Sequence, residues 1–138
     1  LFKFLTANKM LTLQEVFNKV WERAYTPIRS ENEALLQPST PGKNICSYRN
    51  PKDGVNHCFI GVCIPNEVYN EEFEGMGALD LFKSYPNEMK LIFGNMVTEY
   101  RAKNALSELQ SIHDLIEPEF WHERLREFAI KYNLAIPE

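Results

Sequence analysis

All three cysteines of the chain and one histidine, which could bind a metal ion or act as nucleophiles, lie within residues 44–76: Cys46, His57, Cys58 and Cys63. Structural zinc sites usually present their ligands as pairs separated by about two to four residues on a turn. Here eleven residues separate the first two cysteines, four separate the last two, and a single histidine lies beside them. Because this spacing fits zinc poorly, we expect no structural metal and no cofactor. We interpret the cysteines as small buried thiols that fill a tight core.

Cys58 is the best candidate for a catalytic nucleophile. If the chain becomes helical there, the thiol lies at a helix N-terminus, where the backbone dipole favours a thiolate and lowers the pKa. His113 is the candidate base, and Glu117, four residues further on, could orient its ring, whereas the adjacent Asp114 could not do so easily. These groups would suit a thiol-dependent acyl-transfer or hydrolytic enzyme. The alternative is that His113, which lies in an apolar stripe, is a hydrogen-bonded core residue.

A different kind of site is suggested by Tyr48, Arg49 and Tyr69, which could form a ligand-binding surface built on a tight turn. Arginine offers a planar fork that matches phosphate or carboxylate, and tyrosine offers a stacking face with a hydroxyl group. This combination suits a small nucleotide-like ligand. The simpler alternative is that Arg49 pairs with one of the glutamates at 67–74. We expect those acidic residues to form a solvated face or a patch for a basic partner.

The composition limits the class of protein. With 138 residues, 44% of them hydrophobic and 25% charged, the chain matches one soluble globular domain with a proper core. Its formal net charge of −4 disfavours general nucleic-acid binding, because such proteins neutralise phosphates with clustered lysine and arginine. No apolar run approaches the roughly 18–20 residues of a membrane span, so we predict no membrane association.

The cysteine count and the start of the chain give two further predictions. Three cysteines cannot all pair within one chain, so we predict free thiols in a reducing compartment, and the cytoplasm is the simplest assignment. Residues 1–9 precede the first clear helix signal and are set apart as an N-terminal extension or a vector-derived remnant. Residues 10–138 are predicted to form a single globular domain. The sequence does not indicate an oligomeric state.

Apolar residues at helical spacing predict helices along most of the chain. Thr12 and Glu15 have the form of a capping box, which starts an amphipathic helix that Pro27 ends. Further helices are predicted at 78–84, at 87–93 with Asn87 as its cap, at 96–116 as the longest, and from Pro118 onward.

The stretch at 45–57 has the pattern of a β-hairpin. Apolar and polar residues alternate at 45–49, and N-P-K-D-G at 50–54 has the residues of a tight turn. The apolar run that follows suits either a returning strand or a short buried helix, and we favour a strand to His57 that becomes helical near Cys58. The predicted fold class is therefore α+β, a mainly helical single domain with a short β-hairpin.

The same segment resembles a group of small uncharacterised proteins of bacteria, prophages and phages. The shared pattern reads Tyr-Arg, a Gly turn, Cys, a small apolar segment with Gly, then Ile-Pro, Tyr and Glu-Gly, with His-Asp much later. The matching residues here are Tyr48, Arg49, Gly54, Cys58, Gly61, Ile64, Pro65, Tyr69, Glu74, Gly75, His113 and Asp114. The resemblance implies a shared fold and a phage or bacterial cytoplasmic origin, and it carries no established activity.

These patterns favour a function in binding. We predict a small phage-type accessory or counter-defence protein that occupies a host macromolecule or captures a small nucleotide-like ligand. A host protein would need an exposed apolar patch, and Phe73 and Met76 beside the acidic run are the candidates. The alternative is the thiol-dependent enzyme that uses Cys58 and His113.

Overall fold

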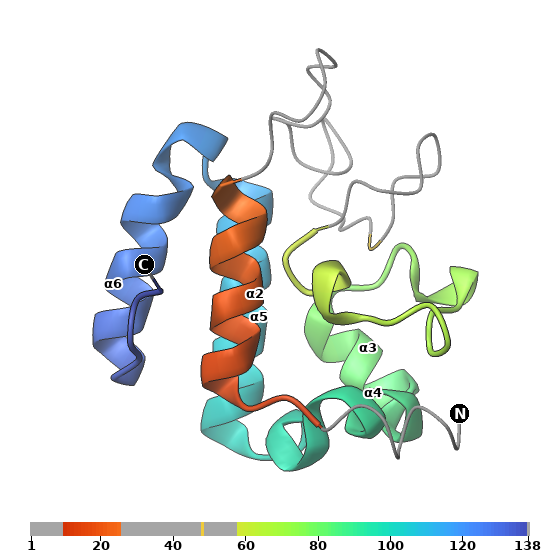
Figure 1. The fold of residues 1–138 in the computed structure, drawn as a ribbon. Helices are drawn as coiled ribbons and strands as arrows, with labels where there is room; N and C mark the ends of the chain where they lie inside the picture. Colours follow the sequence, from red (N-terminus) through yellow and green to blue (C-terminus); the bar gives the residue numbers. More distant parts are fainter. Residues whose placement is uncertain (1–9, 26–47, 49–57, 138) are drawn as a thin grey trace.

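The computed structural model describes residues 10–25, 48 and 58–137 (Figure 1). Within these residues the α-helices are α2 (Leu13–Tyr25), α3 (Ala78–Ser84), α4 (Pro86–Phe93), α5 (Tyr100–Leu115) and α6 (Trp121–Tyr132). Short 3-10 helices are η2 (Gly61–Cys63), η3 (Glu71–Phe73), η4 (Gly94–Val97) and η5 (Pro118–Phe120). None of the helices in this part of the chain is long and apolar enough to cross a membrane.

The predicted α+β class is wrong. Helices account for 71% of the described residues, and no strand or sheet occurs among them, so this part of the protein is mainly helical. Apart from Tyr48, which lies at a bend, the hairpin predicted at 45–57 falls outside the described residues. From Cys58 the chain enters a turn that leads into η2. In an apolar run of this length the spacing of apolar residues does not distinguish a strand from a helix, so packing determines the conformation.

The predicted capping box at the start of α2 is confirmed. The Thr12 hydroxyl oxygen accepts from the Glu15 N–H at 3.1 Å, and a Glu15 carboxylate oxygen accepts from the Thr12 N–H at 2.8 Å. One residue earlier, the Leu11 N–H donates to the Ile92 carbonyl oxygen at 2.8 Å. These bonds fix where α2 begins and attach its start to the end of α4.

The later helices follow the prediction with shifted boundaries. The short helix at 78–84 is confirmed as α3, and the longest helix is α5, with 16 residues. It begins at Tyr100 because the Glu99 carboxylate accepts from the Arg101 and Ala102 N–H groups and so acts as its N-cap. The predicted cap Asn87 lies inside α4, which starts with Pro86 at its first turn.

The helix α5 is central to the described fold, because it contacts both α3 and α6 (Figure 1). The Arg101 side chain at the start of α5 donates to the Lys131 carbonyl oxygen near the end of α6 at 3.3 Å. At the other end, the Trp121 indole N–H donates to the Ile116 carbonyl oxygen at 2.9 Å. The two helices therefore run antiparallel. The stacked rings of Phe17 and Phe128, 5.9 Å apart, join α2 to α6.

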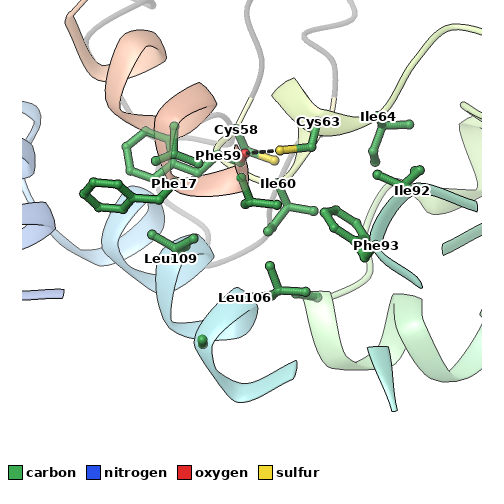
Figure 2. Packing of buried hydrophobic residues seen from close by; sticks show 14 of the residues in the cluster. Phe17, Cys58, Phe59, Ile60, Cys63, Ile64, Ile92, Phe93, Leu106 and Leu109 are labelled. Carbon is green, nitrogen blue, oxygen red and sulfur yellow. Dashed lines mark hydrogen bonds between the residues drawn. The ribbon is translucent and has the colours of Figure 1, made fainter. Parts of the chain in front are cut away.

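A non-helical turn at Cys58, Phe59 and Ile60 lies in the middle of the core, and all three residues are fully buried. Figure 2 shows the turn among labelled side chains from α2, α4 and α5. The next residue, Gly61, is pressed against the backbone of the buried Tyr48. A Cβ atom on Gly61 would lie 2.3 Å from the Tyr48 carbonyl oxygen, closer than real Cβ contacts allow. The absent side chain therefore permits this approach.

Replacing Gly61 by alanine should destabilise the protein by about 1–3 kcal/mol or more, because backbone cannot move aside as a flexible side chain would. Gly77→Ala is the control without a close contact, since nothing lies within 4 Å of its Cβ position. Because Gly77 is the N-cap of α3, where alanine is less favourable than glycine, its effect should be no more than about 1 kcal/mol. Urea unfolding followed by tryptophan fluorescence measures both. Equal stabilities of the two variants would show that the close approach to Tyr48 does not exist.

Candidate functional site

The structure places the proposed nucleophile in the core. Cys58 is fully buried and disulfide-bonded, and its Sγ atom accepts from the Gly61 N–H at 3.3 Å. The prediction that all cysteines are free thiols is therefore wrong for Cys58. The helix that follows, η2, has three residues and its N-cap is Ile60, so the expected dipole of an α-helix at the sulfur is missing. A disulfide is also at odds with the reducing compartment from which the cytoplasm was inferred.

Cys63 is the free cysteine of the described residues. It matches the interpretation of the cysteines as small buried thiols that fill the core. Its side chain is buried, and its Sγ atom lies 4.0 Å from the Phe59 carbonyl oxygen, as the dashed line in Figure 2 shows. Burial raises the pKa of the Cys63 thiol to about 12, although the positive charge of Lys19 lowers it. A buried thiol with such a pKa is a poor nucleophile.

The candidate base His113 is a core residue, with a side chain only 1% exposed. Its ring stacks on Trp121 at 5.2 Å and meets the Phe59 ring edge to face at 5.0 Å. The Nδ1 atom lies 2.9 Å from a carboxylate oxygen of Asp114, so Asp114 is placed to orient the ring, contrary to the expectation that it could not do so easily. Glu117 does not take that role among the described contacts, because α5 ends at Leu115 and helical spacing no longer applies.

The electrostatics of His113 favour a neutral ring. Burial lowers the pKa of His113, the hydrogen bond and charge of Asp114 oppose this, and the positive charge of Arg23 adds to the lowering. In the neutral ring the Nδ1–H group donates to Asp114. An aspartate that orients a histidine also occurs in catalytic triads, but here two aromatic rings pack against the imidazole, and the side chain is almost fully buried.

Gln110 explains why polar residues interrupt the apolar stripe of α5. Its side-chain oxygen accepts from the Ile60 N–H at 2.9 Å, and its amide nitrogen donates at 2.9 Å to the Asp114 oxygen that also binds His113. Gln110 was not among the predicted site residues. Its signal was its position, four residues after the buried Leu106 and three before His113, on the same helix face. This buried network holds the turn at Ile60.

The proposed ligand-binding tyrosines are also used within the fold. The Tyr48 hydroxyl donates to the Met76 carbonyl oxygen at 2.8 Å, and the Tyr48 N–H donates to the Glu74 carboxylate at 2.9 Å. The Tyr69 hydroxyl donates to the second oxygen of the same carboxylate at 2.5 Å. Burial, followed by the charge of Asp114, raises the pKa of Tyr48 well above its ordinary value. Arg49 lies outside the described residues, so its role in ligand binding or in an ion pair remains a prediction.

The predicted protein-binding patch at Phe73 and Met76 does not form an exposed apolar surface. Phe73 is fully buried, with its ring 4.9 Å from that of Tyr85 and 6.0 Å from that of Tyr69. Met76 is half-buried against the core. Phe73 therefore packs into the core and attaches the acidic segment to it.

The described residues contain no metal-binding cluster. Among residues 10–25, 48 and 58–137, no group of three or more His, Cys, Asp or Glu side chains could hold an ion. Cys46 and His57, two of the candidate ligands, lie outside this part of the chain. The absence of a structural metal thus remains a prediction, and zinc analysis of the purified protein would measure it.

A groove between α5 and α6, which the sequence analysis did not predict, is the candidate binding site. Its volume is about 330 Å³, and it is open to solvent. Side chains from both helices and from Ile116 line it: Glu108, Ser111, Ile112, Leu115, Ile116, Arg124, Glu127, Phe128 and Lys131. Its floor is therefore apolar, and four charged side chains lie around it. The volume is at the lower end of the range for ligand pockets in proteins.

One end of this α5–α6 groove is closed by a surface network. The Lys131 ammonium lies 3.0 Å from a Glu108 carboxylate oxygen, which also accepts from the Tyr132 hydroxyl at 3.0 Å. The hydrogen bond from Lys131 to Glu108 raises the pKa of Lys131, and the negative charge of Glu108 adds to this rise. At the other end Leu115 is 63% exposed, although burial of a leucine side chain would lower the free energy. Leu115 lines the groove together with Ile112, Ile116 and Phe128, so it belongs to a continuous apolar surface, which is the kind of surface that binding partners contact.

Lowering the pH should destabilise the protein in part through His113. Its folded pKa lies below the ordinary value of 6.5, so its contribution to stability is complete above that pH and is lost as the pH falls through the folded pKa. Urea unfolding at about pH 7.5 and about pH 5.5 should therefore show a smaller loss for His113→Gln than for the wild type. The pKa of His122 is also lowered, chiefly by burial. Because His122 is present in both proteins, its contribution to the pH dependence is the same in each. A larger loss in the variant would contradict the neutral ring.

The cysteine assignments predict a simple count of reactive thiols. Of the three cysteines, Cys63 is free and Cys58 is in a disulfide, so the unfolded, unreduced protein should take up one equivalent of maleimide. Reduction in denaturant should raise this to all three. The native protein should react hardly at all, because Cys63 is buried. Rapid labelling of native Cys58, identified by peptide mass spectrometry, would reverse the assignment and revive the enzyme hypothesis.

No protein-family model, curated protein or solved structure matches the chain. The resemblance to small bacterial and phage proteins is thus neither supported nor contradicted, and it remains a prediction. The function has to be inferred from the side chains of this protein. Among the described residues, the polar groups near Cys58 are internal, whereas those of the α5–α6 groove face solvent.

Proposed function

We propose that the protein acts by binding a segment of another protein in the α5–α6 groove. The observation that carries this proposal is the exposed Leu115 beside an apolar floor, with charged residues around it. Protein interfaces commonly combine an apolar centre with a polar rim, and a few central residues supply most of the affinity. In the groove, Leu115 and the floor residues would supply the apolar centre.

A protein segment suits this groove better than a small molecule. Pockets for small ligands bury most of the ligand surface and direct a few polar groups at it. The α5–α6 groove is open, and two of its charged groups, Glu108 and Lys131, already bind each other. The tyrosines expected to hold a nucleotide-like ligand, Tyr48 and Tyr69, direct their hydroxyl groups at Met76 and Glu74.

The thiol-dependent enzyme remains a prediction with less support. Its one favourable observation is the contact between His113 and Asp114, which orients the imidazole. Against it, both Cys58 and His113 are buried, and Cys58 is disulfide-bonded. The phage-type or counter-defence role and the cytoplasmic location depend on the resemblance and the composition, and the groove does not bear on them.

Removing the exposed leucine should weaken binding without unfolding the protein. Peptides selected from a displayed random library against the wild type should lose at least about 10-fold in affinity for Leu115→Ser, since a central apolar contact costs more than 1 kcal/mol. Ile130→Ser is the matched control, because Ile130 is 80% exposed on α6 and does not line the groove. Its affinities should stay within about twofold, as expected for a residue outside the interface.

Fluorescence anisotropy with labelled peptides measures these affinities, and circular dichroism checks that each variant is folded. A photoreactive amino acid at Ser111, an exposed residue of the groove, should crosslink to the selected peptides. If the library yields no binders, or if its binders tolerate Leu115→Ser and fail to crosslink at Ser111, the proposed function is wrong.

A further inference from the structure

We infer that the α5–α6 groove takes an amphipathic α-helix of a partner protein, with an acidic residue placed one turn before a basic one. This inference deepens the proposed function and rests on it. It adds the conformation of the partner, its charge order and its direction along the groove. The observations that carry it are the spacing of the groove residues and the sequence of charges along α6.

Both sides of the groove repeat at the spacing of a helix face. On α5 the residues beside the floor are Glu108, Ser111 and Leu115, and on α6 they are Arg124, Glu127 and Lys131. In each set the members follow at three and then four residues, which places them along one face of their helix. The α5–α6 groove therefore runs between two rows of side chains on antiparallel helices. A third helix can pack into such a groove, with its apolar residues at three- and four-residue intervals facing the floor.

The charges along α6 alternate in sign, from Arg124 to Glu127 to Lys131. Lys131 already lies 3.0 Å from Glu108, so the far end of the groove is neutralised within the protein. Among the described residues, Arg124 and Glu127 make no ion pair. A partner therefore meets one unpaired positive group and one unpaired negative group, three residues apart on α6. Charges at the edge of an interface mainly determine specificity and register.

Complementarity to these two charges fixes the chemistry of the occupant. An acidic residue of the partner would lie beside Arg124 and a basic residue, one helical turn away, beside Glu127. Within a helix, an acid placed four residues before a base is the better order, and it also agrees with the helix dipole. The partner with that order runs in the same direction as α6. Its apolar face then covers Leu115 and Phe128.

Two synthetic helical peptides test this inference. Both carry leucines at the same three- and four-residue spacing, and they differ only in whether the acid precedes or follows the base. For the wild type, the peptide with the acid first should bind at least about 5-fold more tightly, consistent with edge charges that set specificity. The double variant Arg124→Glu, Glu127→Arg should reverse this preference. Both substituted residues are exposed, so the variant should fold, and circular dichroism confirms it.

The outcomes separate this inference from the proposed function. If both peptides bind equally and both lose affinity for Leu115→Ser, the groove binds proteins but the charge order is wrong. If only peptides that stay non-helical when bound show this dependence on Leu115, the helical occupant is wrong. If the wild type dimerises with rising concentration and Leu115→Ser does not, a second copy is the occupant and the inference fails. If no peptide binds in a way that depends on Leu115, both the inference and the proposed function fail.

Discussion

The rest of the described structure packs around a buried turn, Cys58 to Ile60, that is not itself part of a helix. Cys58, Phe59 and Ile60 have no solvent exposure, so their amide groups cannot be satisfied by water. The Ile60 N–H finds its acceptor in Gln110, and Gln110 in turn donates to Asp114, which also binds His113. Leaving a buried amide without a partner costs about 1–3 kcal/mol, which accounts for polar side chains on the inner face of α5.

The same need for internal partners explains why the described side chains of the candidate sites make their contacts within the fold. Gly61 follows the buried turn and packs against the Tyr48 backbone, which brings distant parts of the chain into contact. Glu74 then accepts from both Tyr48 and Tyr69. Each of these groups has a chemistry that could serve a site. In the described structure each of them contacts a neighbouring group, and the binding surface that we propose lies between α5 and α6.

The α5–α6 groove arises from the way the two helices are joined and packed. Phe128 faces both α2, through its stack on Phe17, and the floor of the groove. Arg101 and Lys131 hold the helices together at one end, and the bond from Trp121 to Ile116 holds them at the other. Because both ends are tied, the groove is preformed, and a partner would not need to open it. Preformed sites bind at a lower conformational cost.

The sequence by itself determined the local features of this protein: the capping box at Thr12, the α3 helix, the long α5 helix and its buried stripe. These follow from contacts between residues three or four apart, which periodicity reports directly. Only the tertiary structure decided that 58–63 forms a turn and a 3-10 helix, that Asp114 orients His113, and that Leu115 lies beside a groove. Those outcomes depend on which side chains from other parts of the chain supply hydrogen bonds and fill space. The residues of one segment do not indicate which other segments will pack against it.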